Sequence, residues 1–86
     1  MVLFPLEPDA VVEALNLAKQ LGCSIWLGSD AVSDADFNRY GSEGVKVSRF
    51  IYPVSGASAD VVGEALEMIA LHHPGETVWV QYSPSP

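Results

Sequence analysis

The strongest constraint on the fold is that two amphipathic helical segments each run directly into a short apolar segment. In the first, Pro8–Leu21, apolar side chains recur at helical spacing, and the chain then enters Cys23–Leu27. In the second, about Ala59–Leu71, a similar stripe leads to Thr77–Tyr82. The two halves have similar length, which indicates a duplicated helix–strand unit.

Two further segments, Val2–Leu6 and Val45–Tyr52, are predicted strands. The resulting order, βαββαβ, predicts an α+β two-layer sandwich: a ferredoxin-like plait with an antiparallel sheet and two helices on one face. Residues 1–82 form the single predicted domain, and 83–86 form a predicted disordered tail. Pro5 conflicts with a central first strand, because proline donates no ladder hydrogen bond.

An acidic connection joins the second and third predicted strands. Ser33 and Asp36 have the spacing of a capping box, which predicts a short helix over Asp34–Tyr40. The spacing Asp34-x-Asp36-x-Asn38 also fits the first ligands of an EF-hand loop. However, Arg39 stands where that loop needs glycine, so we predict no metal site. The carboxylates of this acidic loop are predicted to orient a basic partner. They are Asp30, Asp34, Asp36 and Glu43.

Aromatic residues alternate with apolar ones along the predicted strands. Successive strand side chains point to opposite faces, so the rings are expected on the sheet face that the two helices leave bare. This surface is predicted to bind a partner, either a second copy or another protein. Its residues are Trp26, Phe50, Tyr52 and Trp79. Arg49 falls on the inner face of its strand, which predicts a bulge or a buried ion pair.

Charge and cysteine content narrow the class of partner. The formal net charge is −7, with only four Lys and Arg residues, which disfavours nucleic acid and anionic membranes as partners. RNA recognition modules also place aromatics on a sheet, but they need more basic residues around them.

Cys23 is the only cysteine, so it has no partner for an internal disulfide. The first residues lack the pattern of a signal peptide, and we expect a cytoplasmic protein.

The paired histidines His72-His73, followed by Pro74, are the weak candidates for catalysis. The His-His-Pro motif, with Arg49–Tyr52 preceding the helix that leads to it, resembles pterin carbinolamine dehydratases. That resemblance implies an enzyme in which His72 and His73 act on a bound pterin. The chain holds no third histidine, which the family uses. Histidines in a last helical turn also bond free carbonyls and favour the negative end of the helix dipole.

The primary prediction is therefore a small, acidic, non-catalytic binding or regulatory protein without a cofactor. It would work through its aromatic face, as a homodimer or by docking a protein partner. A small-molecule sensor is a second hypothesis, because ACT-type regulatory domains share the predicted topology. An enzyme of the pterin-dehydratase kind is the third.

Overall fold

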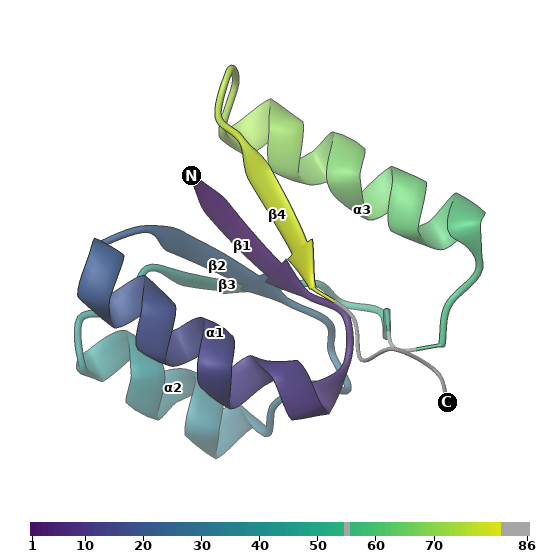
Figure 1. Ribbon diagram of the computed structural model, residues 1–86. Coiled ribbons are helices and arrows are strands. Elements are labelled where there is room, and N and C mark those ends of the chain that lie inside the picture. Colours follow the sequence, from purple (N-terminus) through teal and green to yellow (C-terminus); the bar gives the residue numbers. More distant parts are fainter. Residues whose placement is uncertain (55, 82–86) are drawn as a thin grey trace.

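The protein folds around a parallel sheet with helices on both faces, as the computed structural model shows for residues 1–54 and 56–81 (Figure 1). The predicted tail, 83–86, and Tyr82 lie outside these described residues. The strands are β1 (Val2–Pro5), β2 (Ser24–Leu27), β3 (Val47–Arg49) and β4 (Val78–Gln81). The helices are α1 (Pro8–Leu21), α2 (Asp34–Ser42) and α3 (Ala59–His72).

The predicted antiparallel plait is wrong. All strand pairs are parallel, and the sheet order is β3-β2-β1-β4. The physical reason lies in the connection between β2 and β3. Antiparallel neighbours need only a hairpin, whereas this connection carries α2 and crosses the sheet, which returns β3 parallel to β2.

From β1 to β3 each new strand is added on one side of β1, whereas β4 is added on its other side. This change of side places the helices in two layers, one on each face of the sheet. α1 packs on β1 and β2, and α2 packs on β3, on one face (Figure 1). The connection through α3 runs back over the sheet to β4, and a right-handed crossover in that direction lies on the other face. Leu3 accordingly belongs to the core beneath α1, and Phe4 belongs to the core beneath α3. No helix in residues 1–54 or 56–81 has the length and apolarity to cross a membrane.

Pro5 is tolerated in a central strand because its missing donor faces the side where pairing has ended. The amide of Val2 donates to Thr77 O, directly before β4, and that of Leu6 donates to Gln81 O in β4, each at 2.8 Å. Alternation directs the Pro5 nitrogen toward β2, where the β1–β2 ladder extends only to Leu3. No ladder hydrogen bond is therefore lost at Pro5.

Local sequence signals fix the helix ends. α1 has the predicted bounds, and Gly22 ends it with φ of 67° in the left-handed region. The predicted cap of α2 is confirmed, because Ser33 Oγ accepts from Asp36 N at 3.2 Å. α3 begins after Ser58, whose Oγ accepts from Val61 N at 3.5 Å. All three helix N-termini consequently lie at the carboxyl edge of the sheet (Figure 1).

Candidate functional site

The predicted aromatic face is not one exposed surface. Trp26 is 8% exposed and Phe50 5% exposed, and both belong to the core beneath α3. Their ring centroids lie 5.1 Å apart. The alternation within β2 was predicted correctly, with Trp26 opposite Ile25 and Leu27. The expectation that this face is bare is wrong, because α3 covers it.

The other two predicted rings are separated by the sheet. Tyr52 is half-buried and packs on Phe50, with ring centroids 5.3 Å apart. Trp79 pairs with Leu3 and therefore faces the α1 side, where it is 58% exposed. The structure thus joins Trp26, Phe50 and Tyr52 in one cluster and leaves Trp79 alone on the opposite face.

The histidine pair lies at the C-terminal end of α3, beside Trp26. The indole Nε1 of Trp26 donates to His73 Nε2 at 3.2 Å. Since an indole N–H only donates, His73 carries its proton on Nδ1 and donates to Glu76 Oε2 at 2.8 Å. His72 contacts Met68 O through Nδ1 at 3.0 Å. Both histidines are thereby engaged in ending the helix, and His73 also anchors Trp26.

Glu76 connects this cluster to the N-terminus. The Met1 amino group donates to Glu76 Oε1 at 3.0 Å, while His73 occupies the other carboxylate oxygen. The hydrogen bond from the Met1 amino group, followed by that from His73, lowers the pKa of the Glu76 carboxyl below its ordinary value of 4.5. This cluster lies at the amino edge of the sheet, away from the helix N-termini.

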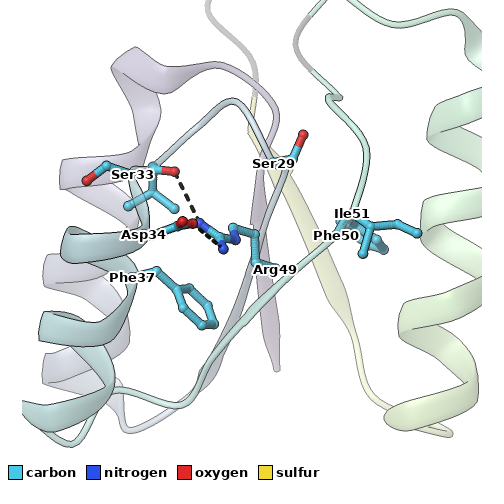
Figure 2. A pocket seen from close by; sticks show the side chains of 8 residues that line it. Ser29, Ser33, Asp34, Phe37, Arg49, Phe50 and Ile51 are labelled. Atoms are coloured by element: carbon cyan, nitrogen blue, oxygen red, sulfur yellow. Dashed lines mark hydrogen bonds and ion pairs between the residues drawn. The ribbon is translucent and has the colours of Figure 1, made fainter.

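A hollow lies at the carboxyl ends of β2 and β3 (Figure 2). Its volume is about 620 Å³, within the range of small-molecule sites of roughly 300–1,000 Å³. The loop after β2 and the start of α2 form one side, and the loop after β3 forms the other. We call it the carboxyl-edge pocket. Its lining residues are Ser29, Val32, Ser33, Asp34, Phe37, Arg49, Phe50 and Ile51.

Arg49 is the cation of this pocket. Its guanidinium contacts Asp34 Oδ1 at 2.6 Å and donates to Val32 O at 3.5 Å. The Phe37 ring is drawn below the guanidinium in Figure 2, and its centre lies 4.7 Å from the guanidinium carbon. Arg49 therefore forms an ion pair, but not the buried one that was predicted, because Arg49 is 25% exposed and Asp34 is 86% exposed. Arg49 is held on three sides, whereas most of the Asp34 carboxylate faces solvent.

Backbone hydrogen bonds lock together the two loops that form the pocket. Ser29 N donates to Tyr52 O at 3.0 Å, and Val54 N donates to Asp30 Oδ1 at 3.4 Å. Gly28 is required between them, because a Cβ there would lie 2.6 Å from Val54 Cγ2 and 3.0 Å from Val54 N. The pocket is therefore held in shape by hydrogen bonds and close contacts within the chain before any ligand arrives.

Ile51 is the most exposed large apolar residue among the described residues, at 96%. It lies on the side of the pocket opposite Phe37 (Figure 2). A scattered surface leucine or isoleucine needs no explanation, but this one borders a preformed hollow. The side chain is thus presented to solvent by a loop whose neighbours are held in place.

Acidic residues occupy the start of every helix at this edge. Asp9 lies in the first turn of α1, Asp34 and Asp36 in that of α2, and Asp60 in that of α3. They stabilise the positive ends of the helix dipoles. They also place negative charge where doubly wound proteins hold the phosphates of nucleotides. The carboxyl edge therefore favours cationic groups over phosphate.

The acidic loop predicted from the sequence is divided by the structure. Asp30, Asp34 and Asp36 lie at the carboxyl edge, where Asp36 pairs with Arg39 at 3.3 Å. Glu43 follows the other end of α2 and pairs with Lys19 at 3.2 Å. Three of the four predicted carboxylates therefore belong to one surface.

Sequence reasoning did not find Ile51 as a site residue. The residue was assigned to a strand over Val45–Tyr52, but β3 ends at Arg49 and the chain turns outward after it. Tyr52-Pro53 was the available signal, since proline disfavours continued pairing of a strand. Arg49 was recognised as unusual, although its partner could not be identified.

Within residues 1–54 and 56–81, no group of three or more His, Cys, Asp or Glu side chains is placed to hold a metal ion. Comparisons with protein-family models, curated proteins and solved structures find no match to this chain. The chemistry of the carboxyl-edge pocket is therefore the basis for a functional proposal.

Proposed function

We propose that this protein is a small non-catalytic binding protein that docks a partner protein at the carboxyl edge of its sheet. The observation that carries the proposal is the 96% exposure of Ile51 at the rim of the carboxyl-edge pocket. Exposed apolar anchors beside a preformed hollow are typical of interaction surfaces, where a few such residues supply most of the binding energy.

The charges around Ile51 favour a partner segment that is both apolar and basic. Asp34 offers a carboxylate that is 86% exposed although it already contacts Arg49. Asp36 adds a second carboxylate on the same turn of α2, and the whole chain carries a formal net charge of −7. An apolar side chain of the partner would pack on Ile51 and Phe37, and a Lys or Arg beside it would pair with Asp34.

Rigidity supports the same proposal. The loops after β2 and β3 are joined through Ser29 N to Tyr52 O and through Val54 N to Asp30. A surface that is already ordered loses little conformational entropy when a partner binds. This arrangement suits recognition by a fixed surface.

The sensor hypothesis has lost its structural basis, because it relied on the plait topology that the parallel sheet replaces. The enzyme hypothesis assigned chemistry to His72 and His73, but their hydrogen bonds at the end of α3 account for both side chains. The proposal therefore rests on the carboxyl-edge pocket alone.

Site-specific photo-crosslinking tests the proposal. A photoreactive amino acid is placed at Ile51 and, as a matched control, at Val12, which is 65% exposed on α1. We expect a protein that crosslinks at position 51 but not at position 12. The purified partner should then bind the wild-type chain directly, more weakly as salt rises.

Substitutions complete the test. We expect Ile51→Glu to weaken that binding by about tenfold or more and Asp34→Asn to weaken it less, while Val12→Glu leaves it unchanged. A partner that binds the Ile51→Glu variant as tightly as the wild-type chain would overturn the proposal. So would identical crosslinks at the two positions.

A further inference from the structure

The outer edge of β4 is a second surface, separate from the carboxyl-edge pocket. In the part of the chain that the structure describes, β4 ends the sheet, since its one neighbour in the strand order is β1. The amides of Val2 and Leu6 donate to Thr77 O and Gln81 O, so the odd-numbered residues of β4 direct their backbone groups toward β1. By alternation, the N–H and C=O of Val78 and Val80 point outward.

The side chains of β4 differ on its two faces. Val78 and Val80 pack into the core beneath α3. Trp79 points to the α1 side, where α1 packs on β1 and β2 and α2 packs on β3. In the described residues β4 therefore has no helix over its α1 side, and Trp79 is 58% exposed. Met1 and Leu21, both exposed, line a hollow at the amino end of this side.

The absence of charged residues along this edge favours a second copy of the chain as its occupant. A chain of net charge −7 repels its own copies wherever carboxylates would meet. The segment Thr77–Gln81 contains no charged residue, and the adjacent Glu76 already pairs with the Met1 amino group at 3.0 Å. Proteins usually protect an exposed edge with Lys or Pro, and β4 contains neither. The edge is thus free of the repulsion that would prevent self-association.

We propose that β4 is the self-association edge of the protein, where two copies pair antiparallel about a two-fold axis at Trp79. In this register Val78 of one copy faces Val80 of the other, and their outward N–H and C=O groups form reciprocal hydrogen bonds. Trp79 faces Trp79 of the second copy in a non-hydrogen-bonded pair, with Cα atoms roughly 4.5 Å apart. Both rings then lie on the same face of one continuous sheet.

This register is self-consistent in a way that neighbouring registers are not. Shifting the pairing by one residue, so that the axis falls between Trp79 and Val80, would place Val80 opposite Trp79 and Val78 opposite Gln81, and the outward groups of Val78 and Val80 would lose their partners. A two-fold axis at Trp79 satisfies both outward residues in both copies. It also covers the most exposed aromatic side chain among the described residues.

Light scattering over a dilution series tests the proposal, with variants that carry a negative or a positive charge at position 79. The wild-type chain should have twice the 9.2 kDa mass of one chain at high concentration. Trp79→Glu and Trp79→Lys should each weaken the dimer by about thirtyfold or more. An equimolar mixture of these two variants should associate again, because residue 79 faces its own counterpart across the axis.

Controls separate this surface from folding and from the carboxyl-edge pocket. Each variant is checked by thermal unfolding, and Ile51→Glu should leave the dimer unchanged. A wild-type chain that stays monomeric at every concentration would overturn the proposal. Variants that dimerise separately but show no preference for each other in the mixture would overturn the register. Dimerisation lost in Ile51→Glu but retained in both Trp79 variants would move the interface to the carboxyl edge.

Discussion

The indole nitrogen of Trp26 lies 3.2 Å from Nε2 of His73, so β2 is joined by a hydrogen bond to the last turn of α3. The contact sets the tautomer of His73 and directs its other nitrogen to Glu76. The sequence suggested Trp26 for partner binding and His73 for catalysis, and in the structure the two side chains are hydrogen-bonded to each other. Their hydrogen bond links the sheet to the helix on the α3 face.

The first prediction concerns this bond. His73→Ala should lower the free energy of unfolding by about 1–3 kcal/mol, because the largely buried indole N–H loses its acceptor. In a Trp26→Phe background, where no donor remains, the same substitution should cost clearly less. A double-mutant cycle by urea denaturation measures the difference. Glu67→Ala, at an exposed position of α3, is the matched control, and equal His73→Ala costs in both backgrounds would contradict the bond.

The second prediction concerns pH. Hydrogen bonds from the Met1 amino group and from His73 lower the pKa of Glu76 in the folded state below 4.5. A lowered folded-state pKa contributes stability that is fully present above the unfolded value and disappears as pH falls through the folded value. The free energy of unfolding should therefore decrease below about pH 4.5, with a smaller slope in Glu76→Gln. Glu67→Gln, exposed on α3, should retain the wild-type slope.

The third prediction concerns Gly28. Alanine at this position brings its Cβ to 2.6 Å from Val54 Cγ2, so the loops after β2 and β3 must separate. We expect a loss of about 1–3 kcal/mol in the free energy of unfolding, as in other overpacked sites. Gly41→Ala is the control, since a Cβ there meets nothing within 4 Å. That helical substitution should stabilise the protein by up to about 1 kcal/mol. Equal thermal midpoints for the two variants would refute the tight approach.

The fourth prediction compares the two partners of the Arg49–Asp34 ion pair. Asp34 is 86% exposed, so Asp34→Asn should cost less than about 1 kcal/mol and still less in high salt. Arg49→Ala should cost more, because it also removes the contacts with Phe37 and Val32 O. Chemical denaturation at low and high salt measures both. A larger cost for Asp34→Asn would show that charge, rather than packing, dominates this site.

Local features of this protein were predictable from its sequence because they depend on short-range chemistry. The bounds of Pro8–Leu21 and the capping of the next helix by Ser33 follow from periodicity and hydrogen-bonding groups a few residues apart. The alternation of Trp26 with Ile25 and Leu27 was correct for the same reason.

Strand direction and face assignment were not predictable in this way. Alternation shows that Trp26 and Trp79 each oppose apolar neighbours, but the strand order decides whether the two rings share a face. The direction of β3 depends on the helix in the connection between β2 and β3. That helix was predicted, but as a short element within a loop and not as a crossover between parallel strands. Ile51 could not be distinguished from a core isoleucine, because only the turn after Arg49 exposes it.

The central position of β1 has a consequence for how the chain is made. β1, α1 and β2 precede the other elements in the chain, and they can pair with one another while β3 and β4 are still being synthesised. The other edge of β1 is filled only by β4, the last described strand to emerge. During translation, the backbone groups of Val2 and Phe4 that face β4 therefore stay unpaired until β4 has been made. A chaperone that recognises exposed strands would meet this edge first.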